Sequence, residues 1–111
     1  MSIRNIFSLQ ENISGGHEVI ERLAEGKNII IERIVSAGHV TPENEWYDQD
    51  RDEWVVLLRG NAAVLFEDKS EVHMKDGDTL FISAHKRHRV TYTSVDPPCV
   101  WLAVHAEMRE C

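Results

Sequence analysis

The sequence has few cysteines, few basic residues and no long apolar run. Its two cysteines, Cys99 and Cys111, lack the Cys-x-x-Cys spacing of a metal site, and in a reducing compartment we expect two free thiols. No apolar stretch approaches the roughly 20 residues of a membrane span, and the N-terminus lacks the apolar segment of a secretory signal. We therefore expect a cytoplasmic protein without a membrane partner.

Positive charge is scarce, because 12 Lys and Arg stand against 19 Asp and Glu, giving a formal net charge of -7. A phosphate backbone repels such a chain, so nucleic acid is not an expected partner. Repeats, low-complexity tracts and linkers are also absent. With 111 residues, of which 42% are hydrophobic, the chain can build one hydrophobic core but not two. We expect an N-terminal arm over residues 1–16 and a single domain over residues 17–111.

The hydrophobic pattern indicates short β-strands separated by polar turns. Residues 17–24 also fit helical spacing, but the turn-like segment 25–28 that follows favours a strand. The other predicted strands cover residues 28–36, 53–58, 62–67, 71–75, 79–82, 88–93 and 99–104. About eight short strands with hardly any helix predict an all-β barrel or sandwich.

Two of the predicted strands are apolar on both faces. In residues 53–58, Trp54 and Val56 oppose Val55 and Leu57, and residues 99–104 show the same pattern. A strand that is apolar on both faces must be covered on both. Either the N-terminal arm or a second copy of the chain must cover the outer face, and we expect a homodimer in which the second copy contributes.

The stretch from Gly77 to Thr93 contains the first candidate for a functional side chain. A Gly-Asp turn begins the strand 79–82, a polar bend follows, and a second strand begins at His88. Because side chains alternate along a strand, His88, Val90 and Tyr92 are predicted to share the apolar face. A histidine on that face is either a hydrogen-bonded core residue or a ligand. The long polar loop 39–52 is the other candidate, since such loops often hold functional residues.

Over residues 31–105 the chain resembles the cupin superfamily, in particular its small single-domain members. Gly77 and His88 have the spacing of the second cupin motif, and Glu53 and Gly60 have that of the end of the first. The resemblance implies a jelly-roll barrel, or double-stranded β-helix, of two antiparallel sheets that is often dimeric. It also implies a divalent metal inside the barrel, held by two His, a Glu and a third His. Cupins include dioxygenases, isomerases and epimerases, and also ligand-binding and regulatory modules.

The chain departs from both motifs. The first motif expects a His-x-His pair, but its two positions fall on Trp46 and Asp48 or on Tyr47 and Gln49, depending on the spacing to Glu53. Counting forward from Gly38 places them on Asn44 and Trp46 instead. In the second motif the expected Pro, Gly and Asn are replaced by Ser83, His85 and Tyr92.

Glu53 and His88 are therefore the only cupin metal ligands that the resemblance carries over. Asp48 is the best third candidate, and His85, Gln49 or Tyr47 could complete a mixed nitrogen and oxygen shell for Zn, Mn, Fe or Ni. The alternative is a buried Glu53–His88 pair without metal, since a buried carboxylate needs a partner. No organic cofactor is indicated. The residues expected to line the pocket are Trp46, Tyr47, Gln49 and Tyr92.

The remaining histidines and loop acids are expected at the surface or at element ends: His17, His39, His73, His105, Asp50 and Asp52. The first functional hypothesis is a barrel that binds a divalent metal or a small polar ligand. The second is a metal-dependent oxygenase or isomerase that acts on a small organic acid or sugar, and the third is a structural dimeric module. The residues do not decide whether the chain is an enzyme.

Overall fold

The computed structural model describes residues 2–9 and 17–111, and residues 19–106 contain eight β-strands. In chain order these are β1 (Val19–Glu25), β2 (Ile29–Ser36), β3 (Asp52–Arg59), β4 (Asn61–Phe66), β5 (Glu71–Lys75), β6 (Thr79–Ile82), β7 (His88–Thr93) and β8 (Cys99–Ala106). There is no helix among the described residues, and so none that could cross a membrane. The all-β prediction is confirmed, and most predicted strands lie within two residues of the observed bounds.

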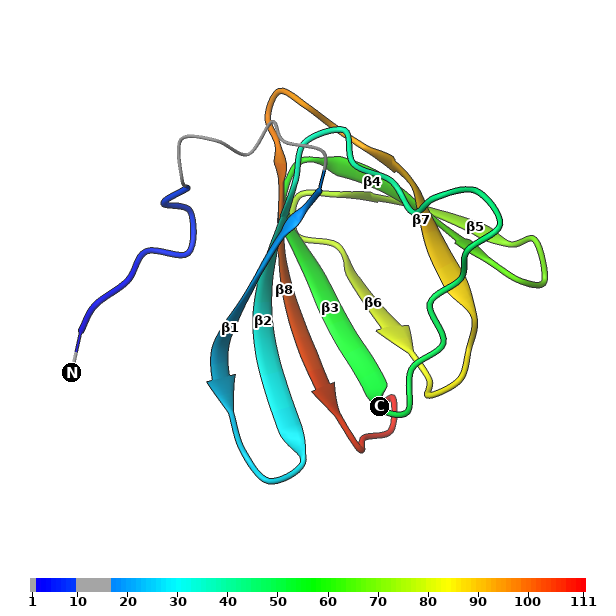
Figure 1. Ribbon diagram of the computed structural model, residues 1–111, viewed down its shortest axis with the longest axis horizontal. Helices are drawn as coiled ribbons and strands as arrows, with labels where there is room; N and C mark the ends of the chain where they lie inside the picture. Colours follow the sequence, from blue (N-terminus) through cyan, green and yellow to red (C-terminus); the bar gives the residue numbers. More distant parts are fainter. Residues whose placement is uncertain (1, 10–16) are drawn as a thin grey trace.

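The strands form two antiparallel sheets that roll around a common interior (Figure 1). One sheet has the order β1-β2-β8-β3-β6, and the other has the order β5-β4-β7. β8 lies between β2 and β3 although it is last in the chain, as a jelly-roll barrel requires. The buried core lies between the sheets and comprises Val55, Leu57, Ala62, Val64, Phe66, Met74, Ile82, Cys99, Trp101 and Ala103.

The turn between β3 and β4 depends on Gly60. Its φ of 107° lies in the left-handed region, and a Cβ built there would stand 2.9 Å from both Cys99 Sγ and Ser94 Oγ. Only glycine therefore allows this tight turn against the start of β8. The turn directs β3 into the five-stranded sheet and β4 into the three-stranded sheet.

Residues 37–51 form the long loop that the sequence predicts, and this loop runs beside β7. Tyr47 N–H donates to the carbonyl of His88 over 2.7 Å, and His88 N–H donates back to Tyr47 over 3.2 Å. Thr41 and His85 add two more backbone hydrogen bonds between the loop and the region of β7. The loop is thus held as an extra edge, and its side chains alternate as they would in a strand.

A β-bulge in β7 changes which of its side chains face inward. Val64 of β4 pairs with Val90, but the preceding Ala63 pairs with Tyr92, so Thr91 is the extra residue. After the bulge Thr93 is buried and Tyr92 is 53% exposed. The prediction that His88, Val90 and Tyr92 share one inner face is therefore wrong for Tyr92, because it assumed unbroken alternation.

The predicted N-terminal arm is described only in part, because Met1 and residues 10–16 lie outside the described residues. The described part, residues 2–9, contains no strand or helix. The Arg33 guanidinium donates to the carbonyls of Ile6 and Ser8, and the Phe7 ring packs against Arg59. The homodimer, and with it a second cover for the outer face of the five-stranded sheet, stays a prediction.

Candidate functional site

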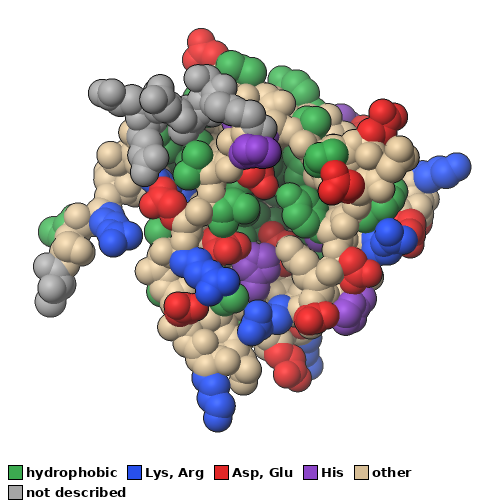
Figure 2. Space-filling view, in the orientation of Figure 1, with side chains coloured by type: hydrophobic (Ala, Val, Ile, Leu, Met, Phe, Trp, Pro, Cys, Tyr) green, Lys and Arg blue, Asp and Glu red, His purple; other side chains and the backbone are tan. Residues whose placement is uncertain are grey.

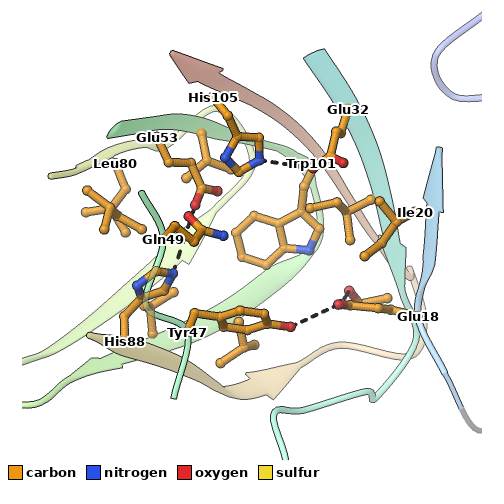
Figure 3. A pocket seen from close by; sticks show the side chains of 16 residues that line it. Glu18, Ile20, Glu32, Tyr47, Gln49, Glu53, Leu80, His88, Trp101 and His105 are labelled. Atoms are coloured by element: carbon orange, nitrogen blue, oxygen red, sulfur yellow. Dashed lines mark hydrogen bonds and ion pairs between the residues drawn. The ribbon is translucent and has the colours of Figure 1, made fainter. Parts of the chain in front are cut away.

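A cavity of about 110 Å³ lies between the two sheets. Its inner part is apolar, with side chains from both sheets, and several carboxylates and imidazoles line it (Figure 3). Figure 2 shows a hollow in this face of the molecule with hydrophobic side chains inside it. The sixteen lining residues are Glu18, Ile20, Glu32, Ile34, Ser36, Tyr47, Gln49, Glu53, Val55, Val64, Leu80, Ile82, His88, Val90, Trp101 and His105.

Glu53 is the most deeply placed acid of the cavity. It lies on β3, where β6 and β8 pair with it on either side, so that Ile82 and His105 are its direct cross-strand neighbours. Burial raises the pKa of the Glu53 carboxyl, while the imidazoles of His105 and His88 partly offset this effect and Glu32 adds to it. Glu53 is therefore a carboxyl group that exchanges its proton closer to neutral pH than an exposed glutamate does.

His88 faces Glu53 across the cavity, with 4.0 Å between Nε2 and the carboxylate oxygen Oε1. Its Nδ1 lies 2.9 Å from the carbonyl oxygen of Lys86, which can only accept, so Nδ1 carries a proton. In the neutral ring Nε2 is then an acceptor that points toward Glu53. The ring stacks on Tyr47 at a centroid distance of 5.5 Å, which fixes its plane.

A second imidazole and carboxylate lie beside this pair. His105 Nε2 is 3.0 Å from Oε1 of Glu32, which comes from the neighbouring strand β2. At the other side of the cavity Glu18 accepts hydrogen bonds from the hydroxyls of Tyr47 and Ser36, each over 3.3 Å. Burial, together with the negative charge of Glu18, raises the pKa of Tyr47 to about 12. Tyr47 therefore stays protonated and remains a donor at neutral pH.

Of the four predicted metal ligands, the structure brings Glu53 and His88 together and separates them from Asp48 and His85. Asp48 and His85 pair with each other at the rim, 2.9 Å apart, and neither lines the cavity. The reason is the alternation of the loop, which turns Tyr47 and Gln49 inward and Asp48 outward. His85 occupies the position of the motif glycine and keeps a left-handed φ of 63°, which makes it a turn residue.

Of the four residues predicted to line the pocket, two line the cavity and two lie outside it. Tyr47 and Gln49 line the cavity, and these are the two positions given by the spacing with three residues before Glu53. Trp46 does not line it, because its ring lies outside between the guanidinium groups of Arg87 and Arg89, each 5.9 Å from the ring centre. Tyr92 is also absent from the cavity lining, because the β-bulge at Thr91 turns its side chain outward.

The lining residues that the sequence analysis did not assign to the pocket include Glu18, Glu32, Trp101 and His105. The prediction that His105 is a surface or capping residue is wrong. The alternation that places Trp101 and Ala103 on the inner face of β8 continues to His105, and this was the available signal. For Glu18, which precedes β1, the sequence offered no comparable signal.

The metal shell that the resemblance implies does not fit these side chains. Across residues 2–9 and 17–111, no three His, Cys, Asp or Glu side chains converge where they could hold an ion. Glu53 and His88 offer two donors, and His105 Nε2 is already paired with Glu32. Two protein ligands are fewer than the three or four that hold Zn, Fe or Mn firmly. The metal predictions for Asp48 and His85 find no support in this geometry.

Comparisons with known proteins agree with the fold. The cupin domain model matches residues 31–105. A proposed mannose-6-phosphate isomerase from Ralstonia eutropha JMP134 is 38% identical, with a TM-score of 0.89 over 97% of this chain and 100% of that chain. A cupin superfamily protein from Desulfitobacterium hafniense DCB-2 is 17% identical, with a TM-score of 0.71 over 92% and 84% of the two chains.

A cupin with a double-stranded β-helix fold from Methanocaldococcus jannaschii is 16% identical, with a TM-score of 0.70 over 96% of this chain and 94% of that chain. The two more distant structures support the fold alone. No curated protein matches the sequence. The family model covers most of the chain and includes both motif positions that line the cavity, Glu53 and His88. The chain therefore belongs to the cupin family, as the motif around Gly77 and His88 predicted.

Proposed function

We propose that this cupin binds a small, unphosphorylated organic molecule in the cavity between its two sheets. The observation that carries the proposal is the cavity of about 110 Å³ in which Glu53 and His88 face each other. A largely apolar cavity with a few convergent polar groups is the usual form of a small-molecule site. At roughly 15 Å³ for each water-sized group, the cavity accommodates about seven such groups.

The charge of the cavity argues against a sugar phosphate. Three carboxylates, those of Glu18, Glu32 and Glu53, line it, and none of the sixteen described lining residues is Lys or Arg. Phosphate recognition normally relies on such cations or on helix N-termini, and the described residues contain no helix. The 38% identical relative is proposed to act on mannose 6-phosphate, and we do not extend that substrate to this chain. The same repulsion disfavours the small organic acids considered above.

A second candidate is a proton-transfer enzyme, such as an isomerase of an unphosphorylated sugar. The observation that favours it is the Glu53–His88 pair. Burial raises the pKa of Glu53, and the fixed Nδ1 proton of His88 leaves Nε2 facing the cavity. An acid and a base within reach of one substrate can move a proton between adjacent carbons. Both groups would then contact the substrate as catalytic residues.

A binding screen with a blocked cavity tests the proposal. Polyols, sugars, amines, carboxylates and mannose 6-phosphate are screened by ligand-observed NMR against the wild type and Ile20→Trp. Ile20 lies in the cavity wall and is half exposed, so the larger indole obstructs the cavity without entering the core. We expect at least one unphosphorylated compound to bind the wild type and to lose binding at least tenfold in Ile20→Trp.

The matched control is Ile3→Trp, which makes the same change on the arm, where Ile3 is almost fully exposed. It should leave binding unchanged. Failure of every compound to distinguish the wild type from Ile20→Trp would contradict the proposal. Sugars that bind are then incubated with the protein in D₂O. Deuterium uptake next to the carbonyl, lost in Glu53→Gln, would support the second candidate.

A further inference from the structure

We infer that the ligand of this cavity carries a positive charge, as a small alkylammonium or related organic cation does. The inference rests on the proposed binding function and names the class of ligand. It begins from Glu53, which is 7% exposed and points into the cavity (Figure 3). Its carboxylate forms no hydrogen bond with any described residue, and its contact with His88 Nε2, at 4.0 Å, is longer than a hydrogen bond. A buried carboxylate without a hydrogen bond is costly, and a ligand donor in the cavity would remove that cost.

Glu18 is a second, half-buried acid at the other side of the cavity. Its carboxylate accepts bonds from two neutral hydroxyls, those of Tyr47 and Ser36, and no described residue forms an ion pair with it. In Figure 3, Glu18 and Glu53 lie on opposite sides of the Trp101 ring. Two acids therefore line one cavity, Glu53 from β3 and Glu18 from the position before β1, and neither forms an ion pair with a Lys or Arg of the described residues.

The walls between these acids are aromatic. Trp101 is buried in the floor of the cavity, and Tyr47 lines its side with its ring stacked on His88. Faces of Trp and Tyr rings attract ammonium groups through their quadrupoles, and this attraction is larger where water is excluded. Acids and aromatic rings around an apolar cavity thus favour a ligand with a charged nitrogen and a short hydrocarbon part.

Glu32 and Lys86, two other charged groups near the cavity, do not offset the negative charge of Glu18 and Glu53. Glu32 adds a third carboxylate and is paired with His105 over 3.0 Å. The nearby Lys86 places its ammonium over the Phe66 ring at 4.6 Å and does not line the cavity.

Three probes of similar size and different charge test the inference: pentylammonium, pentanol and pentanoate. Their dissociation constants are measured at neutral pH by ligand-observed NMR for the wild type, with Ile20→Trp as the blocked reference. We expect pentylammonium to bind at least tenfold more tightly than pentanol, and pentanoate to bind most weakly. Tenfold corresponds to about 1.4 kcal/mol, which is close to the contribution of one hydrogen bond to a charged group.

Variants that remove one carboxylate charge from the cavity test whether charge or shape determines which probe binds. Glu53→Gln and Glu18→Gln should each weaken pentylammonium binding about tenfold and leave pentanol binding unchanged. The matched control is Glu110→Gln, which makes the same change of charge at an exposed position near the C-terminus. It should change neither constant. Equal loss of pentanol and pentylammonium binding in the two cavity variants would show a structural effect and overturn the inference.

The outcomes distinguish this inference from the proposed function. If pentanol or pentanoate binds as tightly as pentylammonium and Ile20→Trp blocks it, the cavity binds small molecules but does not select a cation. The inference is then wrong and the proposed function stands. If none of the three probes distinguishes the wild type from Ile20→Trp, the inference is overturned, and the broader screen above decides the proposed function separately.

Discussion

Two of the imidazole–carboxylate pairs of the molecule, one in the cavity and one at its rim, differ in distance and in exposure. Inside the cavity, Glu53 and His88 are 4.0 Å apart, with side chains that are 10% and 7% exposed. At the rim, Asp48 and His85 are 2.9 Å apart, with side chains that are 48% and 64% exposed. The shorter contact is thus the one in water, and the longer contact is the one in the interior.

The difference shows that distance alone does not rank ionic contacts. Two charges a few ångströms apart interact several times more strongly in a protein interior than in water, and salt screens the exposed pair further. The directions of the pKa shifts agree with this view. Burial raises the pKa of Glu53, whereas the hydrogen bond to Asp48 raises the pKa of His85. Burial thus dominates at the interior pair, and a single hydrogen bond dominates at the rim pair.

The largest expected difference in stability is between His88→Asn and His85→Asn, which make the same substitution in the two pairs. His88→Asn should lower the free energy of unfolding by about 2 to 4 kcal/mol, because it removes a buried ring, leaves a cavity against Phe66 and deprives Glu53 of its neighbour. His85→Asn should leave stability unchanged within error. Asparagine tolerates the left-handed backbone at this position, so the substitution adds no strain. Urea unfolding of both variants measures the difference.

Equal losses of stability in His88→Asn and His85→Asn would contradict the difference between the interior pair and the rim pair. If His85→Asn proved as destabilising as His88→Asn, the rim pair would be holding the loop 37–51 in place by its side chains. The structure instead assigns that role to backbone hydrogen bonds, including the one from His85 N–H to the carbonyl of Gln49 over 2.8 Å. An asparagine at position 85 keeps this bond.

Replacing Glu53 with glutamine is expected to stabilise the protein, by less than His88→Asn destabilises it. Because its pKa is higher in the folded protein than the ordinary value of 4.5, the folded state binds the proton more tightly, and stability falls as pH rises from 4.5 through the folded pKa. Glu53→Gln removes this dependence. Above the folded pKa we expect a gain in melting temperature of a few degrees, since about 1 kcal/mol corresponds to roughly 4 °C or more for a domain of this size. At pH 4 the gain should vanish.

Melting curves of the wild type and Glu53→Gln between pH 4 and 9 provide the measurement. The rim control is Asp48→Asn, which should bring no gain at any pH because water already solvates the Asp48 carboxylate. A Glu53→Gln variant that is less stable than the wild type above pH 7 would show that the neighbouring imidazoles outweigh the cost of burial. The cavity would then hold a satisfied ion pair.

The fold was accessible from the sequence because alternation and turn residues specify strands directly. β5 and β6 were predicted with their observed bounds, and β5 alternates as a strand with one inner face does, with Met74 buried and Val72 partly buried between exposed residues. The alternation rule failed at Thr91 of β7, where one extra residue reverses the faces beyond it. Nothing in the residues of β7 marks that bulge, so Tyr92 was assigned to the wrong side.

The site was accessible only in part. Glu53 and His88 were found because their spacing to Gly60 and Gly77 is local and characteristic. Asp48 and His85 were assigned by residue type, since an acid and an imidazole are good ligands. The structure places both at the rim, Asp48 because the loop alternates about Tyr47 and Gln49, and His85 because it is a turn residue between β6 and β7. The tertiary pairing of the loop with β7 determines that choice. A sequence without its fold does not reveal which face of a loop will point inward.

The smallest expected effect concerns the protonation of His85 at the rim. Its pKa is raised chiefly by the hydrogen bond to Asp48, so Asp48→Asn should return it toward the ordinary value of 6.5, as measured by NMR titration of the ring protons. Asp50→Asn should shift it less, because Asp50 is 3.8 Å from the ring. The raised value means that the protonated pair favours the folded state below pH 6.5 and that this contribution disappears as pH rises through the folded pKa. If Asp48→Asn left the titration of His85 unchanged, the rim contact would not persist in solution, and the interior pair would be the only one of the two that the fold holds in place.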